Sequence, residues 1–164
     1  MKRNDSGSGR PFRQSSYDKA ISMLAKRDLS QHELRRKLEN AGYVGAALDT
    51  ALSRLVQRHE QDDARFAATV LRNRVRQGYG PLRISTELKT HGLMETAIQQ
   101  LLDEAEVDWT ALASRQLRRR YGDQMCADCA ESARRSRFLL RRGFPSFIVR
   151  EAIQVTGSVA DKEN

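Results

Sequence analysis

The chain contains the segment Leu34-Arg-Arg-Lys-Leu38-Glu-Asn-Ala-Gly42-Tyr43, and two later segments repeat its pattern. These read Ile84-Ser-Thr-Glu-Leu88-Lys-Thr-His-Gly92-Leu93 and Arg135-Ser-Arg-Phe-Leu139-Leu-Arg-Arg-Gly143-Phe144. In each segment a leucine lies four residues before the glycine, and a large apolar residue follows it. The pattern is typical of a helix C-terminus, because glycine adopts the left-handed conformation without steric penalty and the next apolar residue folds back onto the last turn.

The three glycines, Gly42, Gly92 and Gly143, lie 50 and 51 residues apart. The similarity continues beyond each glycine, where apolar residues follow at the sixth, ninth and tenth positions. These residues are Leu48, Ala51, Leu52, Ile98, Leu101, Leu102, Val149, Ala152 and Ile153. Positions with this spacing lie on one face of a helix. The sequence therefore predicts a tandem array of three units of about 50 residues each.

Each unit is predicted to contain three helices. In the first unit, an apolar stripe from Tyr17 to Leu24 indicates one helix, and the capping-box pair Ser30 and Glu33 begins the next. In the second unit, Gly78-Tyr79-Gly80-Pro81 interrupts the chain and places a proline in the first turn of the following helix. No stretch alternates as strands do, so the predicted fold class is all-α. Because each unit of a repeat array buries only a small core and stacks on its neighbours, we expect an elongated molecule.

Composition sets the outer boundaries of the array. The three repeats are predicted to span residues 17–61, 62–108 and 109–155. Residues 1–16 are rich in Ser, Gly and Arg, which predicts a disordered basic N-terminal arm. The polar residues 156–164 are predicted to form a flexible tail.

The chain is hydrophilic and strongly basic. Its 164 residues have a mean hydropathy of −0.67, a net charge of +8 and a pI near 10.0, and the positive excess lies towards the two ends. No apolar stretch approaches the roughly 20 residues of a membrane helix, and the N-terminus lacks the apolar core of a secretory signal. We therefore expect a cytoplasmic protein with no membrane partner. The charge favours a partner that carries nucleic acid.

Residue patterns typical of catalysis are sparse. His32, His59 and His91 lie on different predicted helices and lack the spacing of a helical metal site, so we interpret them as solvated surface residues. Cys126 and Cys129 have the spacing of half a zinc ribbon or of a redox pair, but the chain has no second pair and no preceding strand. No phosphate loop or nucleophile–base pair is recognisable. We expect no enzymatic activity, no metal and no cofactor.

Arginine is the more specific surface signal, because its guanidinium binds carboxylate or phosphate through two parallel hydrogen bonds. Arginines gather in the second and third repeats, where they outnumber lysines. The predicted binding surface consists of Arg72, Arg74, Arg76, Arg83, Arg115, Arg118, Arg119, Arg120, Arg134, Arg135, Arg137, Arg141 and Arg142. The alternative for any one of them is a solvated helix face. Arg141 and Arg142 end a predicted helix, so a second alternative for these two is a favourable interaction with the helix dipole.

The second repeat combines Asp62-Asp, Phe66-Ala, an arginine-rich helix, Gly78-Tyr-Gly-Pro-x-x-Ile84-x-x-Glu87-Leu88 and the closing Gly92. This combination resembles the signature segment of the RecX family of bacterial RecA regulators. The first repeat is also similar, through Leu29-Ser-x-x-Glu33-Leu-x-x-Lys37-Leu and Gly42. The resemblance extends from about Tyr17 to Ile153. The third repeat departs most, because Arg135 stands where Leu34 and Ile84 supply apolar side chains.

The resemblance implies a regulatory, mainly inhibitory protein of recombination, DNA repair and the SOS response. Such a protein binds RecA and the RecA filament on single-stranded DNA, lies in the filament groove, and restrains ATP hydrolysis, strand exchange and coprotease activity. We expect a monomer with RecA as its partner and only weak direct binding to DNA.

The main alternative is a direct DNA-binding protein, because three-helix units with an internal turn resemble helix-turn-helix modules and the charge suits DNA. Against it, no unit presents an obvious recognition helix with the Asn, Gln and Arg mixture that reads bases. A preference for RecA-coated DNA over bare DNA distinguishes the two hypotheses.

Overall fold

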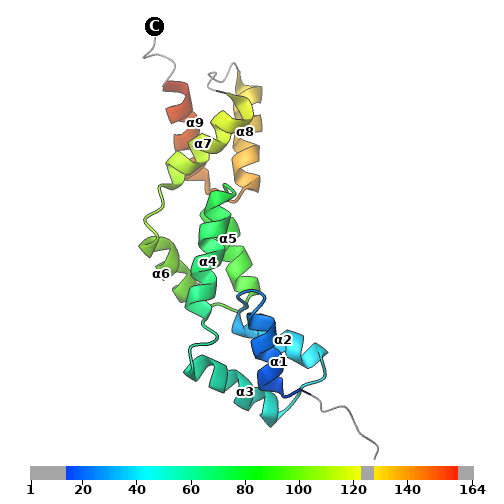
Figure 1. The fold of residues 1–164 in the computed structure, drawn as a ribbon. Coiled ribbons are helices and arrows are strands. Elements are labelled where there is room, and N and C mark those ends of the chain that lie inside the picture. The colour runs from blue at the N-terminus through cyan, green and yellow to red at the C-terminus, as the bar shows by residue number, and fades with distance from the viewer. Residues whose placement is uncertain (1–13, 123–127, 159–164) are drawn as a thin grey trace, which may run out of the picture. The chain divides into compact units, whose positions relative to one another are not determined.

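The computed structural model describes residues 14–122 and 128–158, and all regular structure in those ranges is helical (Figure 1). Nine helices and no strands occur there, which confirms the predicted all-α class. The chain divides into two compact units, Met1–Asp62 and Asp63–Asn164. The first unit contains one trio of helices and the second contains two.

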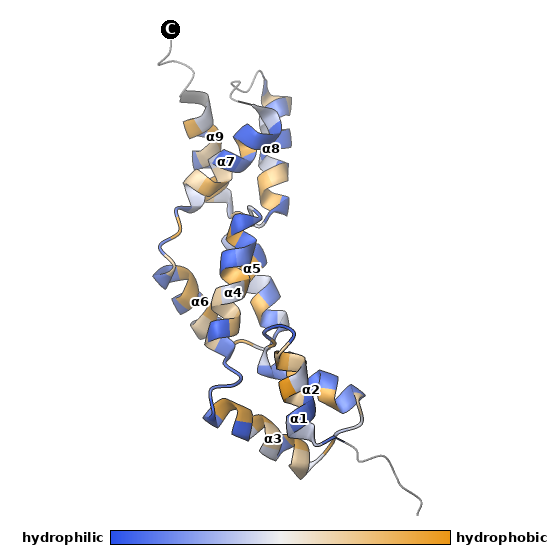
Figure 2. Ribbon diagram, in the orientation of Figure 1, coloured by the Kyte–Doolittle hydropathy of each residue, from blue (hydrophilic) through white to orange (hydrophobic). Residues whose placement is uncertain are grey.

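The first compact unit folds around its own apolar core. Its helices are α1 (Ser16–Leu24), α2 (Gln31–Asn40) and α3 (Ala46–Gln57). The hydroxyls of Ser15 and Ser30 each accept a backbone N–H three residues on, at 3.1 Å, and so cap α1 and α2. The core cluster consists of the buried residues Ala20, Leu29, Leu34, Leu38, Leu48, Leu52 and Leu55. Figure 2 shows hydrophobic and hydrophilic stretches alternating around the helices, the pattern of amphipathic helices.

The second compact unit contains two further trios with linked cores. The first trio is α4 (Asp63–Arg76), α5 (Pro81–Thr90) and α6 (Glu95–Glu104). The second is α7 (Trp109–Tyr121), α8 (Cys129–Arg141) and α9 (Ser146–Ser158). Each trio has its own buried apolar cluster, and the partly buried Val75 and Trp109 pack against both. These two side chains connect the cores of the second and third repeats.

The middle helix of every trio ends in the same backbone motif. Gly42, Gly92 and Gly143 have φ angles of 84°, 84° and 86°. In each case the glycine N–H donates to the carbonyl three residues back, at 2.8 to 3.0 Å. The N–H of the following residue donates to the carbonyl five residues back, at 3.0 to 3.3 Å. This pair of hydrogen bonds is the Schellman motif, and it satisfies carbonyls that a helix end otherwise leaves unpaired.

The terminal helices extend slightly beyond the boundaries expected from composition. Helix α1 begins at Ser16, because Ser15 caps it. At the other end, α9 includes Thr156, which is only 2% exposed and donates its hydroxyl to the Ala152 carbonyl at 2.7 Å. The rest of the predicted arm and tail lies mainly in residues 1–13 and 159–164, outside the described ranges.

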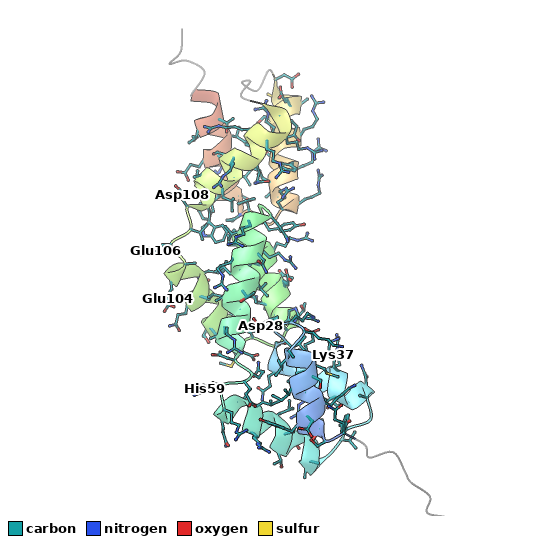
Figure 3. The ribbon with its side chains drawn as sticks, viewed as in Figure 1. Asp28, Lys37, His59, Glu104, Glu106 and Asp108 are labelled. Carbon is teal, nitrogen blue, oxygen red and sulfur yellow. The ribbon has the colours of Figure 1, made fainter. Side chains whose placement is uncertain are left out.

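The third helix of the first two trios ends at a residue other than glycine in the left-handed conformation. His59 follows α3 with φ 56°, and Glu106 follows α6 with φ 49° (labelled in Figure 3). Side chains other than glycine adopt this conformation at a steric cost. Each is the second residue after its helix, so the chain leaves both helices through the same kind of turn.

The second and third repeats meet through direct backbone contact. The Gly80 N–H donates to the Arg142 carbonyl at 2.8 Å, and the Leu82 N–H donates to the Gly143 carbonyl at 3.0 Å. Only a residue without a side chain fits at position 80, since a Cβ there would lie 2.6 Å from the Phe144 nitrogen. We call this contact the repeat joint. It makes Gly78-Tyr79-Gly80-Pro81 a packing element as well as a helix breaker.

We predict that Gly80→Ala lowers the free energy of unfolding by about 2 kcal/mol, because the added methyl group forces two backbone segments apart. Gly80 has an ordinary φ of −84°, so the substitution carries no conformational penalty. Urea unfolding measures the loss, and the single tryptophan, Trp109, should report it through a red-shifted emission.

Gly45→Ala is the control, because a Cβ there meets nothing within 4 Å and only the φ of 71° opposes it. The control should cost about 1 kcal/mol and leave the Trp109 emission unchanged. A Gly80→Ala protein as stable as wild type contradicts close packing at the joint.

Candidate functional site

The predicted arginines fall into three classes by burial. Most are exposed, and these are Arg72, Arg76, Arg83, Arg115, Arg118, Arg119, Arg120, Arg134, Arg137 and Arg141. Arg74 and Arg142 are half-buried, and Arg135 is 2% exposed. A binding surface needs accessible guanidiniums, and those of Arg74, Arg142 and Arg135 are at least partly covered.

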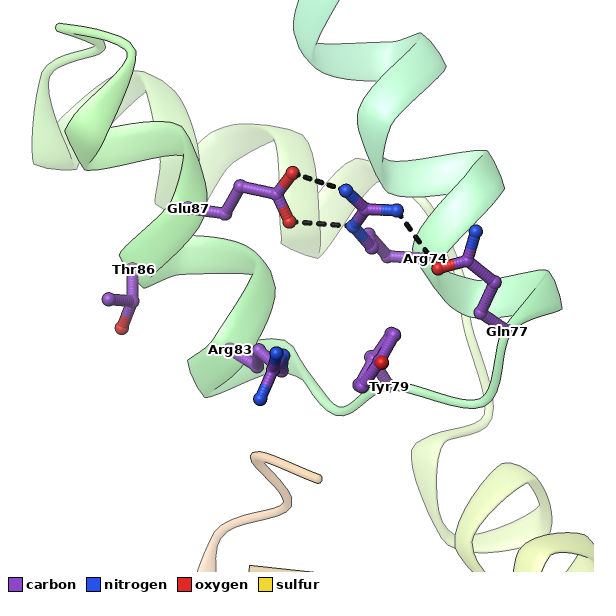
Figure 4. A pocket seen from close by; sticks show the side chains of 6 residues that line it. All are labelled: Arg74, Gln77, Tyr79, Arg83, Thr86 and Glu87. Carbon is purple, nitrogen blue, oxygen red and sulfur yellow. Dashed lines mark hydrogen bonds and ion pairs between the residues drawn. The ribbon is translucent and has the colours of Figure 1, made fainter. Parts of the chain in front are cut away.

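Arg74 is held by a partner within its own repeat. Its Nε and Nη2 donate to the two carboxylate oxygens of Glu87, each at 2.6 Å, and its Nη1 donates to Gln77 Oε1 at 2.9 Å (Figure 4). The hydrogen bonds from Arg74 lower the pKa of the Glu87 carboxyl below its ordinary value of 4.5, against the opposing effect of burial. The same pairing raises the pKa of Arg74. Arg74 therefore clamps α4 to α5.

Arg142 belongs to the repeat joint. Its Nη1 donates to the carbonyls of Gln77 and Gly78, at 2.9 and 3.2 Å, across the contact between repeats. Its own carbonyl accepts from Gly80. The residue thus satisfies carbonyls at the end of α4, a local role that leaves only part of its guanidinium for a ligand.

Arg135 is a core residue. It occupies the position that the fully buried Leu34 and Ile84 occupy in the other repeats. Its guanidinium pairs with Glu131 one turn earlier on α8 and lies 5.4 Å from the Tyr121 ring centroid. Burial and a carboxylate partner remove Arg135 from the accessible surface, which corrects its placement in the predicted binding set.

Two surface cavities flank the turn between α4 and α5. The first, of about 540 Å³, is lined by Arg74, Gln77, Tyr79, Arg83, Thr86 and Glu87 (Figure 4). The second, of about 560 Å³, is lined by Arg76, Gln77, Gln116, Arg119, Arg120, Phe138 and Arg142. Gln77 lines both cavities, so arginines of α4, α5 and α7, and Arg142 directly after α8, converge on this one turn.

Aromatic rings hold several of these guanidiniums in place. The guanidinium of Arg83 lies 4.6 Å from the Tyr79 ring centroid, and that of Arg142 lies 5.5 Å from the same centroid. Arg142 and Arg120 lie 5.0 and 4.8 Å from the Phe138 centroid. Such contacts are favourable because the ring face is negative. They limit the conformational freedom that each arginine would lose on binding a ligand.

Sequence reasoning missed the residues that organise this site. Tyr79 was interpretable only as part of a helix-breaking turn, and Phe138 only as a core residue. Gln116 is 7% exposed and packs directly against Gly78, where an added Cβ would overlap its side-chain amide. The sequence does contain a local indication of a special turn, because Gly78 and Gly80 flank Tyr79 directly after an arginine-rich helix. Its partners lie more than 35 residues further along the chain and follow only from the tertiary packing.

The residues considered for metal or redox chemistry remain apart. His32 and His59 are exposed, while His91 packs edge-on against Phe66 with ring centroids 4.8 Å apart. Cys129 is exposed with a free thiol, and Cys126 lies outside the described residues. Within residues 14–122 and 128–158, no cluster of three metal-ligating side chains occurs. In the same part of the chain, no helix is long and apolar enough to cross a membrane.

Family models match all three repeats. The models for the first, second and third three-helix domains of RecX match residues 17–55, 62–102 and 106–153, which together make up most of the chain. The chain belongs to the RecX family. Relatives named regulatory protein RecX include those of Xanthomonas campestris and Xanthomonas axonopodis, 41% and 43% identical to it. Each alignment covers 88% of this chain and 90% of the relative.

Solved structures share the fold. A crystal structure of RecX from Lactobacillus salivarius is 18% identical, with a TM-score of 0.74 over 86% of this chain and 94% of that one. A second crystal structure of a regulatory protein RecX is 21% identical, with a TM-score of 0.73 over 85% of this chain and 71% of that one. At these identities the likeness establishes the three-repeat RecX fold and nothing about individual contacts.

We predict that Glu87→Gln lowers the free energy of unfolding by about 1 kcal/mol at pH 7, because it removes the charge from a half-exposed two-point pair that solvent partly screens. The pKa of Glu87 is lowered on folding, so its contribution is fully present above pH 4.5. The contribution should disappear as the pH falls through the folded-state pKa. Urea unfolding at pH 7 and pH 3 measures this, with Glu95→Gln, which removes the charge from the more exposed ion pair with Lys89, as control. A difference between wild type and Glu87→Gln that stays constant across this range contradicts the assignment.

Proposed function

We propose that this RecX-family protein is a non-enzymatic regulator that binds RecA and RecA filaments on single-stranded DNA. It lies in the filament groove and restrains ATP hydrolysis, strand exchange and coprotease activity. Its close relatives are named regulatory proteins, which supports the regulatory role. The proposal places the protein in recombination and DNA repair in the cytoplasm, acting as a monomer.

The observation that carries the proposal is the concentration of exposed arginines on the second and third repeats. On α8, Arg134, Arg137 and Arg141 are exposed, and on α7, Arg115 and Arg119 are exposed. Guanidiniums on two helices of one compact unit suit a partner whose surface combines carboxylates with DNA phosphates. Many modest contacts of this kind add up when one chain touches several neighbouring filament subunits.

Several arginines of the first repeat are engaged by partners within that repeat. Arg35 pairs with Asp49 at 2.7 Å, Arg27 pairs with Glu33, and Arg54 lies 4.1 Å from the Tyr17 ring centroid. These arginines are used within the repeat. We therefore assign attachment to the second compact unit and expect charge changes in the first to matter less.

We predict that wild-type protein lowers RecA-dependent ATP hydrolysis on single-stranded DNA. The double variant Arg134→Glu with Arg141→Glu should need about tenfold more protein for half-inhibition, equivalent to roughly 1.4 kcal/mol. The defect should grow with falling salt, because the contacts are ionic. These side chains are exposed, so the melting temperature should stay close to that of wild type.

Lys26→Glu with Arg36→Glu is the matched control, because it makes the same charge change on exposed positions of the first repeat. The control should shift half-inhibition less than threefold. Equal defects in the two variants contradict attachment through the second compact unit. Unchanged ATP hydrolysis with wild-type protein removes the proposal itself.

Direct DNA binding is the competing function, and the arginines favour it as much as they favour a protein partner. We expect a gel mobility shift to show tighter binding to RecA-coated single strands than to bare duplex of the same sequence. Tight binding to bare duplex, with no gain from RecA, is the result that establishes the alternative.

A further inference from the structure

The cavity lined by Arg76, Arg119, Arg120 and Arg142 differs from its neighbour in charge. We call it the arginine pocket. Gln77, Gln116 and Phe138 complete its lining, so it contains four guanidiniums and no carboxylate. The neighbouring cavity contains Glu87, which neutralises Arg74. Of the two, only the arginine pocket carries a large uncompensated positive charge.

Helix ends and one aromatic ring hold these cations together. Arg76 lies in the last turn of α4, and Arg119 and Arg120 lie in the last turn of α7, where the helix dipole favours positive charge. Arg120 and Arg142 both lie within 5.0 Å of the Phe138 centroid. Their positions therefore do not depend on a carboxylate partner, and within the described residues none of the four forms an ion pair.

Gathering like charges in a concave site raises the local potential and attracts anions. The helix dipoles and the Phe138 ring offset part of the repulsion between the guanidiniums, but each of them acts only on the arginines next to it. An anionic ligand that touches several guanidiniums at once offsets more of this repulsion. Phosphate suits such a site best, because its oxygens accept paired hydrogen bonds from arginine. The side-chain amides of Gln77 and Gln116 line the same cavity and can supply neutral donors.

We infer that the arginine pocket binds the phosphate backbone of a single-stranded nucleic acid. A flexible strand can bend its phosphates into a concave site, whereas a duplex presents them on a rigid convex surface. Phe138 is 7% exposed and already contacts two guanidiniums, so it offers no free face for base stacking. Binding is therefore independent of base sequence.

The inference deepens the proposed function, on which it rests for the choice of nucleic acid over other polyanions. It assigns the pocket to DNA and leaves the exposed arginines of α8 to the protein partner. The two assignments separate experimentally, because binding of a bare strand is measured without RecA.

The test is the fluorescence anisotropy of a labelled oligo-dT, titrated with the full chain at several salt concentrations. Arg76→Glu with Arg119→Glu should weaken binding at least tenfold at about 0.1 M salt. It should also reduce the slope of log K against log salt by about 1.4, near 0.7 for each phosphate that is no longer neutralised. Both side chains are exposed and lie outside the core, so the chain should still fold, and the melting temperature measures the small loss expected from negative charge at a helix C-terminus.

Lys26→Glu with Arg36→Glu is the matched control, because it makes the same charge change on exposed positions of the first repeat that line neither cavity beside the turn. It should weaken oligo-dT binding less than threefold. Arg76→Lys with Arg119→Lys should give an intermediate loss, since the charge remains and the paired hydrogen bonds do not. Oligo-dA and oligo-dC should bind about as tightly as oligo-dT.

Three results overturn the inference. Equal losses in the pocket and control variants show that net charge alone attracts the strand. ATP and unlabelled oligo-dT are compared as competitors for the labelled strand. If ATP displaces it at a far lower concentration of phosphate groups, the pocket is a nucleotide site. Oligo-dT binding unchanged in the pocket variant, with inhibition of RecA lost, assigns it to an acidic protein surface. If wild-type protein binds oligo-dT as expected and leaves RecA unaffected, the pocket stands and the proposed function fails.

Discussion

The left-handed turn after the middle helix of each repeat is the constraint on which the structure depends. It ends the helix, satisfies its last carbonyls and directs the next apolar residue into the core. Tyr43, Leu93 and Phe144 follow the three glycines, and Phe144 is fully buried. In the third repeat the same turn has a second role. The Gly143 carbonyl accepts from Leu82, so the turn that closes one repeat also joins it to another.

The turn after α8 both ends a helix and joins two repeats, and this explains why arginines converge on the repeat joint. Helix C-termini favour cations, and the arginine pocket brings together the ends of α4 and α7 and the residue that follows α8. Some guanidiniums are then used structurally, as Arg142 is at the Gln77 and Gly78 carbonyls. Others remain available at the rim. A surface of this kind combines stability with binding, because the residues that hold the joint also set the positions of those that can contact a ligand.

The candidate site was only partly predictable. The arginine positions are evident from the sequence, and so is the second-repeat turn. Their roles are not, because an arginine on a predicted helix looks the same whether it is solvated, paired or buried. Arg135 is a core residue because Glu131, one turn earlier, pairs with its guanidinium and Tyr121 lies beside it. Arg74 became a clamp because α5 brings Glu87 within 2.6 Å. The Glu131–Arg135 pair has the i, i+4 spacing of helix neighbours and can be inferred from the sequence, whereas the burial of Arg135 beside Tyr121 and the Arg74–Glu87 contact depend on tertiary packing.

The sequence by itself determined the all-α class, the three repeats and the glycine at each middle-helix end, because those features follow from local backbone preference and from the 3.6-residue period of apolar side chains. Tertiary structure alone decided which arginines remain accessible and where they gather. Those outcomes depend on contacts between residues far apart in the chain, such as Gly80 with Arg142 and Arg120 with Phe138. Such contacts exist only after the helices of the two repeats have packed, so the arginine pocket is a property of the folded unit.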